Sequence, residues 1–152
     1  MLPANARPFS HIELELSEAE ISTPEHSLEL AQNALDLATR YALNGLQIGA
    51  HTRLAQAFQE LGKLELAFTH SSQAVELLIT YDCTNFYRAE SWLTHTRLLM
   101  ALEKPEAKQH LENLVNWVLK TSQKHVPAQY QTDFLEHNAV NRAILEMGKL
   151  AG

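Results

Sequence analysis

Apolar residues recur at helical spacing along most of this chain. Between residues 24 and 44 they lie three and four positions apart, which places them on one face of an α-helix: Leu28, Ala31, Leu35, Ala38 and Ala42. Comparable stripes follow, and each is interrupted by Gly, Pro or a polar turn. The pattern predicts helices near residues 24–44, 46–61, 63–81, 85–103, 105–125 and 127–149. The predicted fold class is therefore all-α.

Capping and turn residues mark where these helices should begin and end. Thr23-Pro24-Glu25 combines a capping hydroxyl, a proline at the first helical position and an acid near the positive end of the helix dipole. Gly45 and Gly62 should each end a helix, because glycine readily takes the left-handed conformation found at helical C-termini. Asn138 should cap the last helix and break the tail near that residue.

The segment from residue 11 to residue 21 is ambiguous. Its apolar residues are compatible with a short helix, although Ile12, Leu14 and Leu16 taken alone alternate with polar residues as in a strand. We predict a helix there.

The helices should form antiparallel pairs with short connections, and one pair carries a family pattern. A leucine, small residues, an aromatic residue and a turn glycine follow one another at fixed spacing: Leu54, Ala55, Phe58, Gly62, Leu64, Ala67 and Ala74. In this spacing the chain resembles a tetratricopeptide repeat (TPR), a helix-turn-helix of about 34 residues. Residues 46–80 carry the resemblance most closely. Longer helices and loops make the array similar to the variant repeats of bacterial signalling ATPases and maltose-activator-type transcriptional regulators.

The resemblance implies one α-α superhelical domain over residues 1–152. Its helix-turn-helix units should cover about residues 10–44, 46–81 and 85–125, and residues 127–150 should form a C-terminal capping helix. A chain of 152 residues suits one such domain and leaves no room for a second of ordinary size. In such arrays neighbouring pairs stack to bury their apolar stripes, and the first helices line an inner groove.

The quartet HTRL occurs twice, at residues 51–54 and at residues 95–98, an offset of 44 residues. Aligning the two units through their turns pairs Leu61 with Leu102, an offset of 41. The quartets are thus three residues out of register (44 − 41) and do not occupy equivalent positions. Because three residues are close to one helical turn, Leu54 and Leu98 should still face in similar directions.

Polar residues on the two first-helix faces are the candidate partner-binding residues. They are positions that the packing stripes leave unused: Thr52, Arg53, Gln56, Gln59, Glu60, Glu90, Thr94 and Arg97. Such a groove could hold an extended peptide or a partner helix. Arg53 and Arg97 are its cations and could bind a carboxylate of the partner. The alternatives are a merely solvated face, or pairing of these arginines with Glu60 or Glu90 in the same chain.

The charge distribution argues against nucleic acid as a partner. The net charge is −6, and the stretch from Glu13 to Asp36 holds seven acidic residues and no Lys or Arg. The second helix of the last unit is mildly basic, which predicts a solvated face or a contact with an acidic partner, through Lys104, Lys108, His110, Lys120 and Lys124.

No apolar run approaches the roughly 18 residues that span a bilayer, and residues 1–10 lack the order of a secretory signal. Cys83 is the single cysteine, so we expect a cytoplasmic protein without an internal disulfide and without a membrane contact.

Signatures of catalysis, metal binding and cofactor binding are missing from the sequence. The eight histidines form no HxxxH pair, and the phosphate-binding pattern GxxxxGK does not occur. Nothing around Cys83 resembles a nucleophile signature. We therefore predict no catalytic residue, no metal site and no cofactor.

These observations lead to a protein-interaction module as the predicted function. The partner should be a protein or peptide, in the context of a bacterial signalling or regulatory protein. A small-ligand sensor is the second hypothesis, and a deep pocket lined by Arg53 or Arg97 would favour it. The third is a structural oligomerisation module, in which exposed apolar ends at residues 1–22 or 139–150 pair between chains as a homodimer.

Overall fold

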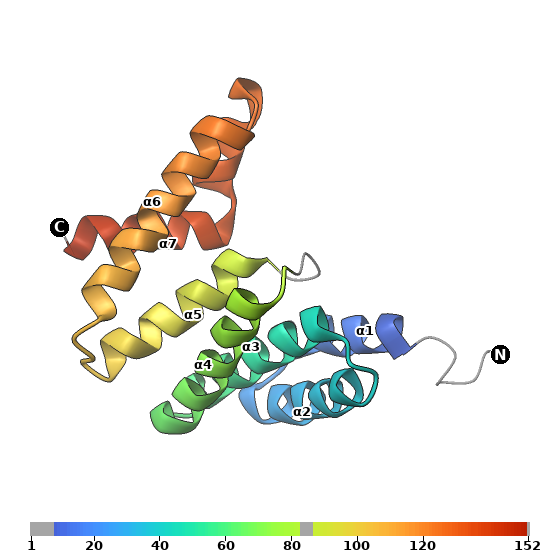
Figure 1. Cartoon of the computed structure of the whole chain (residues 1–152). Helices are drawn as coiled ribbons and strands as arrows, with labels where there is room; N and C mark the ends of the chain where they lie inside the picture. Colours follow the sequence, from blue (N-terminus) through green and yellow to red (C-terminus); the bar gives the residue numbers. More distant parts are fainter. Residues whose placement is uncertain (1–7, 83–86, 152) are drawn as a thin grey trace. The chain divides into compact units, whose positions relative to one another are not determined.

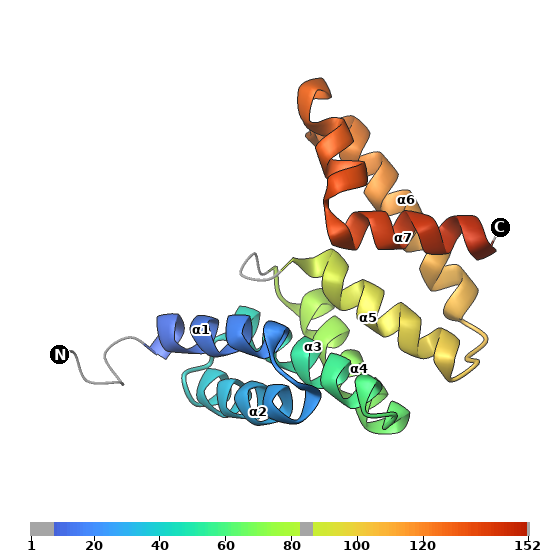
Figure 2. The same ribbon diagram turned by 180° about the vertical axis from the view of Figure 1, so that it is seen from behind.

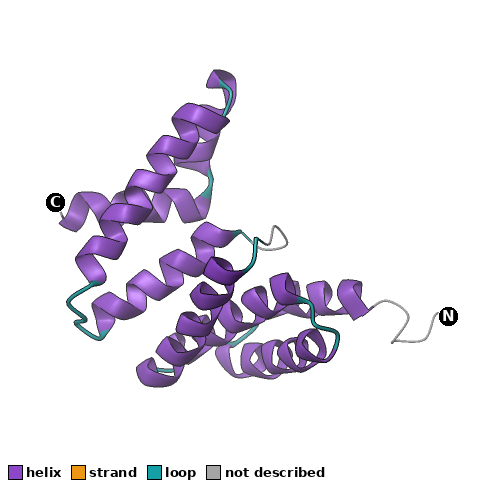
Figure 3. Cartoon of the chain, viewed as in Figure 1, coloured by secondary structure: helices purple, strands orange, loops and turns teal. Residues whose placement is uncertain are grey.

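The computed structural model describes residues 8–82 and 87–151. All regular structure in these ranges is helical, without a strand, which confirms the all-α prediction (Figure 3). The α-helices are α1 (Pro8–Ile21), α2 (Pro24–Arg40), α3 (Asn44–Glu60), α4 (Leu64–Thr80), α5 (Arg88–Ala101), α6 (Ala107–His125) and α7 (Ala139–Ala151). Two short helical segments, η2 (Ala128–Tyr130) and η3 (Asp133–His137), precede α7. Cys83 lies outside the described residues.

The chain divides into two compact units, Met1–Leu98 and Leu99–Gly152, and each is described by itself. In the first unit, successive helices pack as neighbours: α1 against α2, α2 against α3, and α3 against α4 (Figures 1 and 2). In the second unit, α6 packs against α7 and η3. The result is an all-helical array whose sequential helices pack in pairs. None of the described helices is both long enough and apolar enough to cross a membrane.

Three helix-to-helix turns share one backbone geometry. Each contains a residue with positive φ, namely Ala42 (52°), Gly62 (75°) and Glu103 (53°). The amide that follows donates to a carbonyl five residues back: Leu43 N to Ala38 O at 2.8 Å, Lys63 N to Phe58 O at 2.9 Å, and Lys104 N to Leu99 O at 2.8 Å. This is the six-to-one hydrogen bond of the Schellman motif. Because Gly62 and Glu103 occupy the same place in their turns, the alignment of Leu61 with Leu102 is confirmed.

One predicted helix end is wrong. Gly45 does not terminate a helix but lies buried in the first turn of α3, and α2 ends at Arg40. Ala42 takes the left-handed conformation in its place. That conformation costs a non-glycine residue about 1–2 kcal/mol, and the paired amide-to-carbonyl bonds of the turn offset the cost.

The other local signals fold as predicted. The hydroxyl oxygen of Thr23 accepts a hydrogen bond from the amide of His26 at 3.4 Å, with Pro24 as the first residue of α2. The side-chain oxygen of Asn138 accepts from the amide of Asn141 at 3.0 Å and caps α7. The ambiguous segment is helical, so the helix predicted there is confirmed.

Small residues allow close helix crossings in the first unit. Ala67 on α4 is fully buried and packs with Ala55 and Leu98. A second cluster, of Ile48, Ala74 and Leu78, is covered by Trp92. The α1 end has its own cluster, formed by Ile12, Leu16, Ala34, Ala38, Leu46 and Ala50. Ala67 and Ala74, the alanines of the repeat pattern on α4, are therefore members of the buried clusters of the first unit.

We expect Ala67→Leu to destabilise the protein by about 1–3 kcal/mol, because three added carbon atoms at this crossing force α3 and α4 apart. Thermal melting measures the effect. The control is Gln73→Leu, which adds a leucine at an exposed position of the same helix. A melting temperature of Ala67→Leu equal to that of the wild type would contradict the assignment of this residue to a helix crossing.

Candidate functional site

Most residues of the predicted groove lie where α3 and α5 contact each other. Thr52 and Thr94 are buried, with 0% and 3% of their surface exposed, and Arg53 is 9% exposed. Hydrogen bonds between neutral side chains connect the helices directly: Thr52 Oγ1 to Ser91 Oγ at 2.8 Å, and Gln56 Nε2 to Thr94 Oγ1 at 3.1 Å. The prediction that these positions are not used for packing is therefore wrong for Thr52, Arg53 and Thr94. The two first-helix faces pack on each other.

We call this contact the polar interface and define it by six residues: Thr52, Arg53, Gln56, Glu90, Ser91 and Thr94. Its hydroxyls are satisfied locally as well as across the contact. Thr52 donates to Ile48 O at 2.8 Å, and Thr94 donates to Glu90 O at 2.9 Å. Each threonine oxygen is thereby left to accept from the facing helix, so the two threonine hydroxyls are buried without loss of hydrogen bonds.

Arg53 joins three helices of the first unit. Its guanidinium donates to Glu90 Oε2 at 3.0 Å on α5 and to Gln56 Oε1 at 2.9 Å on α3. It also forms an ion pair with Glu20 Oε2 on α1 at 3.3 Å. Burial raises the pKa of Glu90 above its ordinary value, while the charge of Arg53 opposes that rise. The alternative in which Arg53 pairs with Glu90 within the chain is confirmed.

The remaining predicted groove residues are more accessible. Gln59 is half-buried, and Glu60 and Arg97 are exposed on α3 and α5. Their role in partner binding stays a prediction. Arg53, in contrast, is engaged by acidic side chains, so it does not present a free cation to a peptide or to a small ligand.

Two histidine contacts of α4, one with α3 and one with α5, were not predicted from the sequence. His51 Nδ1 of α3 lies 3.0 Å from His70 Nδ1 of α4, and His95 Nδ1 of α5 lies 2.9 Å from Ser71 Oγ of α4. His51 and His95 are the first residues of the two HTRL quartets, so the repeated quartet was the available signal. Burial, with a smaller contribution from the charge of His70, lowers the pKa of His51 to about 4.

Ser71 and His95 are paired as a nucleophile and its base would be, but their burial makes this a structural contact. Ser71 and His95 are 1% and 7% exposed, so the hydroxyl has no open path to a substrate. Ser71 Oγ also lies 3.1 Å from Phe68 O, and the ring of Phe68 stacks on His95 with centroids 5.4 Å apart. Across the described ranges, no three His, Cys, Asp or Glu side chains are grouped so that they could hold a metal ion.

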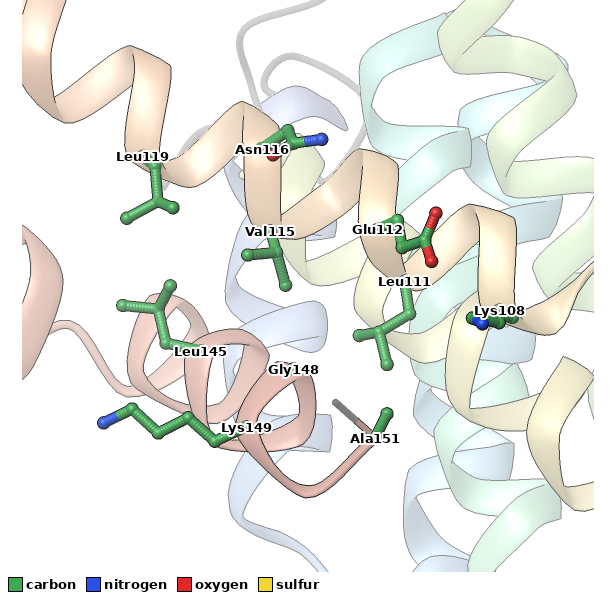
Figure 4. Close-up of a pocket in the computed structure, with 10 residues that line it drawn as sticks. All are labelled: Lys108, Leu111, Glu112, Val115, Asn116, Leu119, Leu145, Gly148, Lys149 and Ala151. Carbon is green, nitrogen blue, oxygen red and sulfur yellow. The ribbon is translucent and has the colours of Figure 1, made fainter.

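The second unit contains an open apolar groove between α6 and α7, with a volume of about 720 Å³. We call it the α6–α7 groove. Its lining residues are Lys108, Leu111, Glu112, Val115, Asn116, Leu119, Leu145, Gly148, Lys149 and Ala151. Leu111, Val115 and Leu119 point from α6 toward α7, and Leu145 points back toward α6 (Figure 4).

Gly148 sets how closely the two helices approach at this groove. A Cβ atom placed on Gly148 would lie 2.8 Å from Cγ2 of Val115, closer than carbon atoms normally approach. Away from this contact the side chains do not fill the space, and Leu119 is 40% exposed. The groove was not predicted from the sequence, although Lys108 was expected in a mildly basic helix and residues 139–150 were expected to form an exposed apolar end.

We expect Arg53→Ala to lower the free energy of unfolding by about 2–3 kcal/mol, because it leaves the buried Glu90 carboxylate without its cation. Arg97→Ala, which removes an exposed arginine of α5, should change it by less than about 0.5 kcal/mol. Urea denaturation of both variants measures the difference. Equal stability of the two variants would contradict a structural role for the Arg53 contacts.

The low pKa of His51 makes stability depend on pH. Because the folded protein disfavours protonation of His51 while the unfolded chain binds the proton near its ordinary pKa of 6.5, stability is complete above pH 6.5 and falls toward pH 4. The expected loss between about pH 7.5 and pH 5 is about 2 kcal/mol, measured by denaturation at both pH values. His51→Gln should flatten the dependence, whereas His26→Gln, at an exposed histidine of the same unit, should retain most of it. An unchanged pH dependence in His51→Gln would contradict the assignment.

Comparisons with protein-family models, with curated proteins and with solved structures found no match. What is shown of this chain is thus an array of sequential helices that pack in pairs.

Proposed function

We propose that this chain is a non-catalytic, TPR-like interaction module that binds an apolar protein segment with acidic flanks in the α6–α7 groove. The observation that carries the proposal is the groove itself, an open apolar surface between two helices of the second unit. The repeated turn geometry and the buried alanines of α3 and α4 support the TPR-like part of the proposal. This assignment moves the binding surface away from the first-helix faces, because the polar interface is occupied by its own contacts.

The chemistry of the groove specifies its ligand. Its floor is formed by leucine and valine side chains, which favour apolar side chains of a partner. Lys108 and Lys149 line it as cations and Glu112 as the single acid, so a segment with acidic residues beside its apolar ones is favoured. A partner helix whose apolar residues recur every three or four positions would fit this cleft between two helices, as in other helix-in-groove contacts.

The small-ligand alternative has less support. It requires Arg53 or Arg97 to line a deep pocket, and Arg53 is instead engaged by Glu20, Glu90 and Gln56. The α6–α7 groove has a size typical of ligand sites, but it offers no cluster of converging polar groups that would orient a small molecule.

A peptide selection tests the proposal. Random displayed peptides are selected on the immobilised wild-type chain and then compared on Leu119→Glu, which places a charge in the groove, and on Leu66→Glu. Leu66 is the matched control because it is 49% exposed, against 40% for Leu119, and lies on α4 outside the groove.

Enriched peptides should carry apolar residues at helical spacing together with Asp or Glu. They should bind the wild type and Leu66→Glu at least about tenfold more tightly than Leu119→Glu, as expected when a charge enters an apolar contact. Failure to enrich any such peptide, or equal binding to both variants, would rule out the groove as the binding surface.

A further inference from the structure

We infer that the partner of the α6–α7 groove is helix α1 of a second copy of this chain. The inference rests on the proposed function, since it names the segment that the groove binds. It joins an exposed apolar stripe of the first unit with the apolar groove of the second unit of another copy.

Helix α1 presents apolar side chains on the face that its own unit does not use. Leu14 is 68% exposed and Ile21 is 86% exposed. They are seven residues apart, so both project from one face of the helix, about 10 Å from each other along its axis. The opposite face packs into the first unit through Ile12, Leu16 and Ala19. A second chain could therefore contact α1 without pulling it out of its own fold.

The length of the groove matches the length of this stripe. The apolar row on α6 runs from Leu111 through Val115 to Leu119. The eight steps from Leu111 to Leu119 rise about 12 Å along the helix, close to the separation of Leu14 and Ile21. Leu145 faces this row from α7, so an inserted side chain would have apolar contacts on two sides (Figure 4).

Charge favours the same pairing. Helix α1 contains four glutamates and no Lys or Arg, and Glu18 lies between Leu14 and Ile21 on the exposed face. The groove offers Lys108 and Lys149 beside one acid, Glu112. The net charges of the two units differ in the same direction: residues 1–98 hold twelve acidic and six basic residues, whereas residues 99–152 hold six of each. An acidic donor helix and a groove with two lysines are electrostatically complementary.

The contact is heterologous, since the donor surface and the acceptor surface of one chain differ. Copies would associate head to tail: a closed ring fills every groove, whereas an open chain leaves one groove and one α1 free at its ends. One such contact buries few apolar side chains, well short of a standard interface, so association should be weak and dependent on concentration.

Analytical ultracentrifugation of the full chain tests the inference, from about 10 μM to about 1 mM, a range that covers weak association. The wild type should shift from monomer to larger species as concentration rises, and added salt should weaken the shift. Two variants separate the surfaces: Leu14→Glu/Ile21→Glu alters only the donor helix, and Leu119→Glu alters only the groove. Leu66→Glu/Ile79→Glu, at exposed positions of α4, is the matched control and should associate as the wild type does. Circular dichroism verifies that every variant remains helical.

The decisive step is mixing. Each altered variant alone should stay monomeric, but an equal mixture should form a one-to-one complex, because one variant retains the groove and the other retains α1. Self-association of Leu14→Glu/Ile21→Glu alone would overturn the inference and indicate that grooves pair with grooves. A wild type that stays monomeric throughout would also overturn it. In that case groove-dependent peptides from the selection would show that the proposed function survives, whereas their absence would show that both proposals fail.

Discussion

The guanidinium of Arg53 is the contact on which the arrangement of the first unit depends. It is nearly buried and reaches acidic side chains on α1 and α5 from its place on α3. A charge removed from water is costly unless counter-charges and hydrogen bonds replace the lost hydration, and Glu90, Glu20 and Gln56 provide them. The hydroxyls of Thr52 and Thr94 donate to carbonyls of their own helices, and they also bond across the contact to Ser91 and Gln56. Three helices are thereby fixed by directional contacts, in addition to the small apolar clusters around the alanines.

Local features of the fold could be predicted because each has a direct physical cause. Apolar periodicity predicted the helices, and the caps at Thr23 and Asn138 followed from side-chain oxygens that accept backbone hydrogen bonds. The turn at Gly62 was predictable because glycine favours positive φ. The turn at Ala42 was not, because alanine has no such preference and only the completed turn stabilises it there. Gly45 was misassigned because Ala42, not Gly45, is the left-handed residue of this turn, and Gly45 is already part of α3.

The candidate sites were harder to predict, for two different reasons. Thr52 and Thr94 are polar residues outside the apolar stripes. From the sequence alone, such residues cannot be distinguished from residues on a solvated face. Only the structure shows that their hydroxyls are satisfied by the facing helix. The α6–α7 groove depends on where α6 and α7 cross, near Gly148. The spacing of apolar residues along each helix does not predict the position of that crossing. Its apolar row on α6 was nevertheless present in the sequence as residues at helical spacing.

The polar interface also limits how such an array can evolve. A contact made only of leucines and alanines tolerates a shift of one helix along the other, so a duplicated helix pair can dock on any neighbour. Hydrogen-bonded pairs such as Thr52 with Ser91 and Gln56 with Thr94 are satisfied in one register, and a displaced copy would leave buried polar groups unpaired. A new unit inserted here would have to bring complementary residues with it. The helix pairs of this chain are therefore not interchangeable modules, and lineages that lengthen the array would be expected to do so at its ends.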